Sequence, residues 1–193
     1  MAAAPHLSAM RDLFGTAPVA GLVLREDVVS EAEEGHLVHR CQALDLSPFQ
    51  FQGWEGKRLT KSYGWHYDFD RGRIGETEPI PDWLLTAREK AANALGRDPV
   101  AFLQALVIRY DPGAGIGWHR DRPQFDEVIG VTLASDATLA FRRRREDGKF
   151  DRTKQPLHRR SAYLLSGEAR AEWQHGIAEH EALRFSLTFR SLR

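Results

Sequence analysis

His119 and Asp121 are the residues of this chain whose types and spacing most clearly suggest chemistry. They stand two positions apart, and in an extended strand two such side chains project to the same face of the sheet. A neutral imidazole beside a carboxylate supplies half of a metal site, and His175 is the best candidate for a third ligand. Two histidines and one carboxylate on one side of an octahedral ion leave three positions open, which is the facial triad of non-haem Fe(II) oxygenases.

A His-x-Asp triplet by itself is a weak signal, and an ordinary surface pair is its common explanation. Zn(II) also accepts histidine and aspartate ligands, so the spacing leaves the choice between zinc and iron open. The neighbouring sequence strengthens the metal-site hypothesis. Before the pair, Tyr110-Asp111-Pro112-Gly113 predicts a turn that redirects the chain. After it, a strand near the C-terminus carries two arginines.

That strand alternates between apolar and polar side chains. Leu183, Phe185, Leu187 and Phe189 belong to one face, and Arg184, Ser186, Thr188 and Arg190 to the other. Two arginines on an inner face cost free energy unless they meet anions. The pair could bracket a small dicarboxylate, or one arginine could hold it while the other braces a ligand carboxylate. A solvated edge strand with both arginines outside is the alternative.

Together these motifs resemble the AlkB family of Fe(II)- and 2-oxoglutarate-dependent dioxygenases. The resemblance rests on the order Arg109-Tyr110-x-Pro-Gly, His119-x-Asp121, His175 and Arg184-x5-Arg190, and it runs from about residue 58 to the C-terminus. It implies Fe(II) held by His119, Asp121 and His175, with 2-oxoglutarate and O2 as co-substrates. It implies that Arg184 pairs with the distal carboxylate of 2-oxoglutarate, that Tyr110 gives that carboxylate a hydroxyl, and that Arg190 lies near the metal, bracing Asp121 or facing the substrate. The implied activity is oxidative demethylation of N-alkylated bases in DNA or RNA, as in the repair of alkylation damage.

Three positions depart from the pattern of the DNA-repair members. Where those members commonly have asparagine, this chain has Ile108 and Ser186, and where some have an acidic residue that contacts the base it has Pro123. The metal ligands and the arginines are retained, so activity is expected. Two alternative functions stay open: the same catalyst acting on a protein, a lipid or a small molecule, and a non-catalytic nucleic-acid-binding module that has kept the fold.

Two regions are candidates for substrate contact. Residues 46 to 80 are rich in aromatics and glycines without clear periodicity, which predicts a binding loop or lid, and the AlkB family has a nucleotide-recognition lid at this place in the chain order. Flat rings hold unstacked bases, so Tyr63, Trp65 and Tyr67 are predicted contacts, although some rings of the region should pack in the core. The run from Arg142 to Arg145 alternates faces, and Arg142 and Arg144 are predicted substrate contacts; a solvated charged surface is the alternative.

Length and composition fit one domain over residues 1–193, with support helices and the lid in 1–100 and the β-structure in 101–193. Lys plus Arg and Asp plus Glu are equal at 27 each, but residues 142–160 hold nine Lys or Arg against three acids, a candidate phosphate-binding face. Cys41 is alone, which suits a reducing compartment. No apolar run is long enough to cross a membrane, and residues 1–21 lack the pattern of a signal peptide, so we expect a cytoplasmic protein with no membrane partner. We expect a monomer, although the sequence leaves dimerisation open.

The predicted elements indicate an α+β domain. A first helix should follow the capping box of Ser30 and Glu33, and a second should be N-capped by Asp82 and ended by Gly96. About eight short strands follow Ala101, which favours a strand barrel at the C-terminal end. The resemblance implies a double-stranded β-helix, or jelly roll, with flanking N-terminal helices and with the ligands inside, near its open end.

Overall fold

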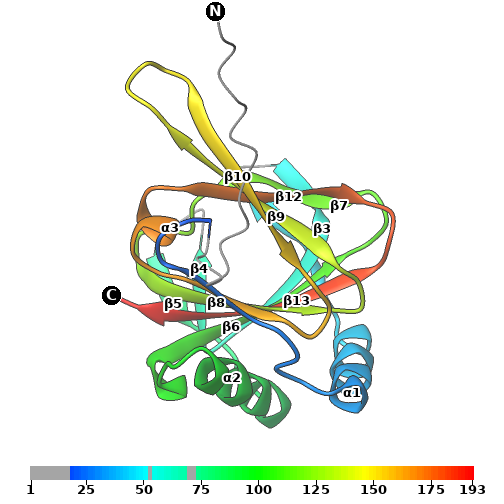
Figure 1. Ribbon diagram of the computed structural model, residues 1–193. Coiled ribbons are helices and arrows are strands. Elements are labelled where there is room, and N and C mark those ends of the chain that lie inside the picture. Colours follow the sequence, from blue (N-terminus) through cyan, green and yellow to red (C-terminus); the bar gives the residue numbers. More distant parts are fainter. Residues whose placement is uncertain (1–17, 52–53, 69–72) are drawn as a thin grey trace, which may run out of the picture.

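The computed structural model describes residues 18–51, 54–68 and 73–193, and two antiparallel sheets facing each other form its centre (Figure 1). In spatial order, the larger sheet contains β1 (Leu22–Arg25), β11 (Ala162–Leu165), β8 (Phe125–Leu133), β13 (Arg184–Leu192), β6 (Phe102–Tyr110), β3 (Trp54–Tyr63) and β2 (Ser47–Phe51). The smaller sheet contains β10 (Phe150–Leu157), β9 (Ala137–Arg144), β12 (Gln174–His180) and β7 (Ala114–His119). This is a jelly roll, as the sequence predicted.

Three α-helices, one turn of 3-10 helix at Pro99–Ala101 and a separate hairpin complete the described fold. The α-helices are α1 (Glu31–Gln42), α2 (Asp82–Ala94) and the short α3 (Gly167–Ala171), and the hairpin pairs β4 (Trp65–Asp68) with β5 (Arg73–Glu76). Helices α1 and α2 lie on the outer side of the larger sheet (Figure 1). Within the described ranges, no helix is both long and apolar enough to cross a membrane.

The two faces of the larger sheet have different roles. On β13, Phe185, Leu187 and Phe189 are fully buried in the core that also contains residues of α1 and α2. Arg184 and Arg190 occupy the other face of the same strand. The solvated-edge alternative is therefore wrong, because β13 lies between β8 and β6 and Arg184 is fully buried.

A β-bulge in β7 turns His119 toward the interior. Ile116 pairs with Ile177 and His119 pairs with His175, so two residues of β7 stand opposite one residue of β12. Such a bulge re-aims the side chains that follow it. Ile116 packs against the buried core, and the His119 ring lies 4.3 Å from that of buried His175. In a regular strand, two residues three apart would point to opposite faces, and the bulge brings these two to the same face.

The prediction of an irregular lid over residues 46 to 80 is wrong for most of the described part, which forms β2, β3, β4 and β5. Strands β1, β2 and β3 also belong to the larger sheet, so the β-structure is not confined to residues 101–193. The sequence of β3 does not show which of its faces is buried, because one half-buried face carries the polar side chains of Arg58, Thr60 and Ser62. At α2, the N-cap is Pro81, and Asp82 is the first helical residue.

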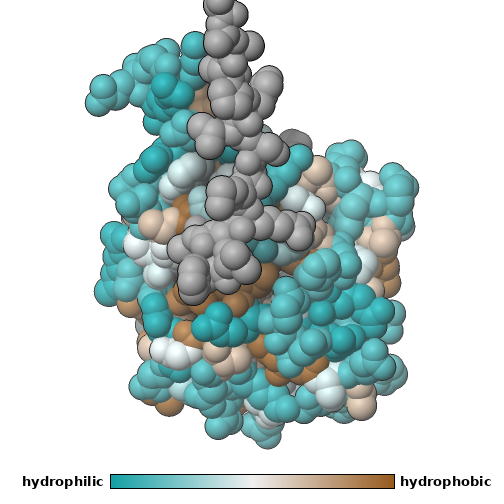
Figure 2. Space-filling view, in the orientation of Figure 1, coloured by the Kyte–Doolittle hydropathy of each residue, from teal (hydrophilic) through white to brown (hydrophobic). Residues whose placement is uncertain are grey.

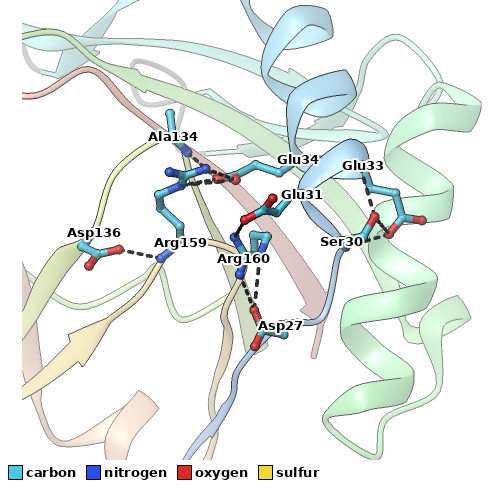
Figure 3. Close-up of polar contacts among 9 residues, drawn as sticks. All are labelled: Asp27, Ser30, Glu31, Glu33, Glu34, Ala134, Asp136, Arg159 and Arg160. Atoms are coloured by element: carbon cyan, nitrogen blue, oxygen red, sulfur yellow. Dashed lines mark hydrogen bonds and ion pairs between the residues drawn. The ribbon is translucent and has the colours of Figure 1, made fainter.

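Helix α1 is joined to the β-structure by a buried carboxylate (Figure 3). Glu34 is 2% exposed and accepts hydrogen bonds from the backbone N–H of Ala134 and from the Arg159 guanidinium. Burial alone would raise the pKa of Glu34, but these hydrogen bonds lower it below its usual 4.5. Arg160 lies beside this contact and pairs with exposed Asp27 and Glu31. Arg159 and Arg160 thus fasten a helix and do not extend the basic surface.

Glu34→Ala is expected to destabilise the fold by about 2 kcal/mol, because it leaves the buried N–H of Ala134 without an acceptor. The matched control, Glu31→Ala on the same helix, removes a side chain that is 84% exposed and should change stability much less. Urea denaturation at pH 7 measures both. Since the folded-state pKa of Glu34 is lowered, its contribution is present above about pH 4.5 and declines on acidification below it. Equal losses in the two variants would contradict a special role for Glu34.

Candidate metal centre

Three predicted ligands converge between the sheets. The ligand atoms of His119, Asp121 and His175 all lie within 4.8 Å of one another. His119 Nδ1 donates to the carbonyl oxygen of Gly117 at 2.9 Å, which leaves the Nε2 lone pair free to bind a metal. The expectation that one regular strand presents both His119 and Asp121 is wrong: β7 ends at His119, and Asp121 lies in the segment that follows.

The protein environment favours the metal-binding protonation states. Burial, and then nearby His119, lowers the pKa of His175 to about 3, and burial also lowers the pKa of His119. The pKa of Asp121 is lowered. Burial alone would raise it, but the positive charge of Arg190, together with the two neighbouring histidines, has the larger effect. Two neutral imidazoles and one carboxylate are the forms that a divalent cation requires.

Arg190 fixes the Asp121 carboxylate. Its Nε donates to Asp121 Oδ1 at 2.9 Å, and its Nη1 donates to Gln104 Oε1 at 3.0 Å. Gln104 in turn donates to the backbone oxygen of Trp65 on β4 at 2.8 Å. Of the two positions that the sequence left open for Arg190, the structure has the one that braces the Asp121 carboxylate. The second Asp121 oxygen, Oδ2, lies 3.5 Å from His175 Nε2.

Arg184 is a buried cation without an anionic partner in the described part of the chain. It is fully buried, and its Nη2 lies 3.4 Å from Thr132 Oγ1, while its Nε and Nη1 have no hydrogen-bond partner. Its guanidinium lies 5.1 Å from the ring centre of Tyr110, the residue directly opposite on β6. An unpaired buried charge is costly. A ligand carboxylate that accepted hydrogen bonds from Nη1 and Nη2 at the end of the guanidinium would remove most of this cost, so the site fits the distal end of 2-oxoglutarate.

Of the predicted substrate residues of the aromatic region, Tyr63 lies in the core and not at this centre. Tyr63 is 4% exposed and packs in the core with Leu84 and Phe102, so its predicted contact with substrate is replaced by a packing role. Trp65 is partly exposed, and its backbone joins the Gln104 contact. Tyr67 belongs to β4, and its side chain lies outside the part of the structure that is described.

Arg142 and Arg144 lie on the outer face of the smaller sheet. Their neighbour Phe141 is fully buried, and its ring lies 6.3 Å from that of His175. Successive side chains of a strand point to opposite faces, and Arg142 and Arg144 therefore lie away from the metal ligands. Their predicted contact with substrate stays a prediction, and it concerns a part of the substrate other than the reacting group.

Arg58 is the residue that sequence reasoning missed. It lies on β3 with its guanidinium 3.8 Å from the centre of the Phe49 ring, and burial lowers its pKa. Strand β3 pairs with β6 so that Thr60 lies opposite Ile108, which puts Arg58 on the same face of the sheet as Ile108 and Tyr110. In the sequence, Lys57-Arg58 looks like ordinary surface charge, and only the pairing of β3 with β6 brings Arg58 inward.

Comparison with known proteins agrees with this geometry. The sequence model of the 2OG-Fe(II) oxygenase superfamily matches residues 21–190. The chain is 28% identical over 166 residues to the Xenopus tropicalis tRNA (carboxymethyluridine(34)-5-O)-methyltransferase alkbh8, covering 81% of this chain and 25% of that protein. It is 28% identical over 193 residues to the Arabidopsis thaliana alkylated DNA repair protein ALKBH8 homolog, covering 84% of this chain and 52% of that protein. It is 32% identical over 152 residues to the probable RNA/DNA demethylase ALKBH6 of Danio rerio, covering 72% of this chain and 56% of that protein.

The chain spans a quarter to about half of the length of these relatives. Among solved structures, OsALKBH1 superposes with a TM-score of 0.64 at 18% identity, over 89% of this chain and 96% of that one. A prolyl-4-hydroxylase of Pseudomonas putida superposes with a TM-score of 0.59 at 15% identity, over 90% and 93%. These two likenesses show the fold. The family match and the convergent His119, Asp121 and His175 together show that the chain belongs to the 2OG-Fe(II) oxygenase superfamily, in which its relatives place it in the AlkB family.

Proposed function

We propose that this dioxygenase oxidises an N-methyl group on a base of DNA or RNA. Bound Fe(II) supplies the oxidising chemistry: O2 and 2-oxoglutarate are consumed, succinate and CO2 are released, and one oxygen atom is inserted into a C–H bond. The N–CH3 group becomes N–CH2OH, which breaks its C–N bond to release formaldehyde and return a proton to the nitrogen. The observation that carries the oxygenase part of the proposal is the convergent triad, together with a fully buried Arg184 that has no anionic partner among the described residues.

Different residues of this chain would bind the iron and the 2-oxoglutarate. His119, Asp121 and His175 would hold the iron from one side, and Arg190 orients the Asp121 carboxylate. Arg184 would bind the distal carboxylate of 2-oxoglutarate with a bidentate contact, and Tyr110, opposite it, would add its hydroxyl. Arg184 and His175 are buried, which limits the access of water to these two side chains.

The departures at Ile108 and Ser186 leave a polar lining intact. Ser186 stands opposite Ile108 on one side and Thr132 on the other, and both Ser186 and Thr132 are buried. The Thr132 hydroxyl already contacts Arg184. We infer that these two hydroxyls take over the polar contacts that asparagine makes in the DNA-repair members, so that the co-substrate pocket functions without them.

Support for a nucleic-acid substrate comes from the relatives whose names specify alkylated DNA repair or RNA/DNA demethylation. The test is to load the protein with Fe(II) anaerobically, add O2 and 2-oxoglutarate, and measure succinate and formaldehyde with methylated and unmethylated oligonucleotides. Formaldehyde that depends on the methylated oligonucleotide is the expected result. Succinate without it would contradict the base demethylase and favour the same catalyst acting on a protein, a lipid or a small molecule.

A further inference from the structure

The outer face of the smaller sheet carries a row in which aromatic rings and guanidiniums alternate. The Arg142 guanidinium lies 4.7 Å from the ring centre of Trp118 and 4.8 Å from that of Phe150. Arg152 lies 5.5 Å from the same Phe150 ring. Arg142 is also held by a 2.7 Å hydrogen bond from its Nε to Gln174 Oε1. We call Trp118, Arg142, Phe150 and Arg152 the outer row; its members lie on β7, β9 and β10.

The outer face is an unneutralised cationic surface. Arg142, Arg144, Arg152 and Lys154 share it, since Arg152 pairs in register with Arg142 and Phe150 with Arg144. In the part of the chain that the structure describes, no carboxylate forms an ion pair with any of these four side chains. Like charges placed directly opposite each other on neighbouring strands are destabilising. The sheet bears this cost at Arg142 and Arg152, where a bound anion would relieve it.

The other two arginines of the run, Arg143 and Arg145, are neutralised by carboxylates of the protein. Arg143 forms ion pairs with Glu168 and Glu172, at 3.4 and 3.1 Å. Arg145 pairs with Asp147 and Asp151, at 3.4 and 3.7 Å. One side of the β9–β10 hairpin is therefore neutralised from within the protein, and the other is not. The hairpin projects beyond the two sheets in Figure 1, and its surface is hydrophilic in Figure 2.

Trp118 links this surface to the metal centre. It is 39% exposed, an unusual state for a large ring, and with Val100 and Leu103 it makes up the exposed large apolar side chains of the described residues. It directly precedes the ligand His119, on the edge strand of the smaller sheet. A chain molecule lying along the outer row would pass over this edge to reach the interior.

We propose that the outer row binds a stretch of single-stranded nucleic acid that flanks the target base. Guanidiniums bind phosphates, and exposed rings stack on bases that a single strand leaves accessible. A polyanion without bases, such as polyglutamate, would use the charges but not the rings. The inference deepens the proposed function, because it assigns the part of the substrate that lies away from the reacting methyl group.

The test is fluorescence anisotropy with a labelled, unmethylated single-stranded DNA of about 20 nucleotides at about 0.1 M salt. Arg144→Gln/Arg152→Gln removes two charges from the outer face, and the matched control Arg143→Gln/Arg145→Gln removes two from the neutralised side of the same hairpin. We expect the outer variant to raise Kd at least about tenfold and to reduce the salt slope by about 1.4, the value for two lost phosphate contacts. The control should change Kd less than about twofold. Equal losses in both variants, or no loss in either, would overturn the proposal.

A second variant examines the rings. Trp118→Ala should weaken binding of the oligonucleotide about tenfold, with binding of polyglutamate unchanged. If Trp118→Ala left binding of the oligonucleotide unchanged, recognition would be by charge alone and the proposal would fail. Because the probe carries no methyl group, the outcome is separate from demethylation. Binding through the outer row without formaldehyde release would contradict the proposed function alone, and formaldehyde release with unaltered binding in the variants would contradict this inference alone.

Discussion

Asp121→Asn is expected to lower the affinity for Fe(II) by at least about 100-fold and to abolish succinate production in a protein that stays folded. The amide keeps the shape of the side chain and an oxygen that can accept the hydrogen bond of Arg190 Nε. It removes the negative charge that two neutral histidines cannot supply. Alanine would be a poorer probe, since it would also leave the largely buried Arg190 guanidinium without its partner.

Two measurements make this expectation specific to the metal. Anaerobic titration with Fe(II), followed by tryptophan fluorescence, gives the affinity, and a urea denaturation curve of the metal-free protein gives the stability. The control is Asp126→Asn, which alters a carboxylate that is 58% exposed and lies 3.7 Å from Arg193. Unchanged Fe(II) affinity in Asp121→Asn would remove Asp121 from the ligand set, whatever happened to turnover.

The sequence was sufficient for the central strand of the fold. From Arg184 to Arg190 of β13, polar and apolar side chains alternate, so the period of two could be read from the sequence. The burial of both faces could not, because it depends on β8 and β6 pairing on either side. The capping box at Ser30 and Glu33 was equally readable, because both halves of the contact lie within four residues, and the structure has both hydrogen bonds. Local signals of this kind predict local structure well.

The route by which His119 and Asp121 meet could not be predicted. The bulge in β7 depends on the register of β7 with β12, which lies more than fifty residues away in the chain. The segment Gly115-Ile116-Gly117-Trp118 does not by itself specify this bulge. The same holds for the face on which Arg142 lies, which follows from the burial of Phe141. Side-chain direction at such positions is set by pairing between distant strands, and the sequence of one strand does not specify it.

The second large effect is expected at Arg184. Arg184→Met should abolish the stabilisation that 2-oxoglutarate gives to the wild-type protein, while leaving the melting temperature of the ligand-free protein unchanged or raised. The reason is the present state of the guanidinium, which is fully buried with Nε and Nη1 unpaired. Replacing a buried, uncompensated charge by an apolar side chain of similar length is neutral or favourable, and the penalty appears only when the carboxylate has to bind.

The comparison residue is Arg170, a buried arginine that is already used by the fold. Its Nη2 donates to the carbonyl oxygens of Arg122 and Phe125. Arg170→Met leaves both carbonyls without this donor, so it should destabilise the ligand-free protein by about 2 kcal/mol. Thermal denaturation with and without 2-oxoglutarate, under anaerobic conditions with Fe(II), measures both variants in one experiment.

The size of the ligand effect makes the two outcomes easy to separate. At a 2-oxoglutarate concentration of about 100 times its Kd, binding stabilises a protein by about 2.7 kcal/mol. For a chain of 193 residues, this raises the melting temperature by about 5 to 10 °C. Arg184→Met should lose this rise, and Arg170→Met should keep it from a lower starting point. If Arg184→Met instead lowered the ligand-free melting temperature as far as Arg170→Met does, the buried guanidinium would be a structural element, and its assignment to the co-substrate carboxylate would be wrong.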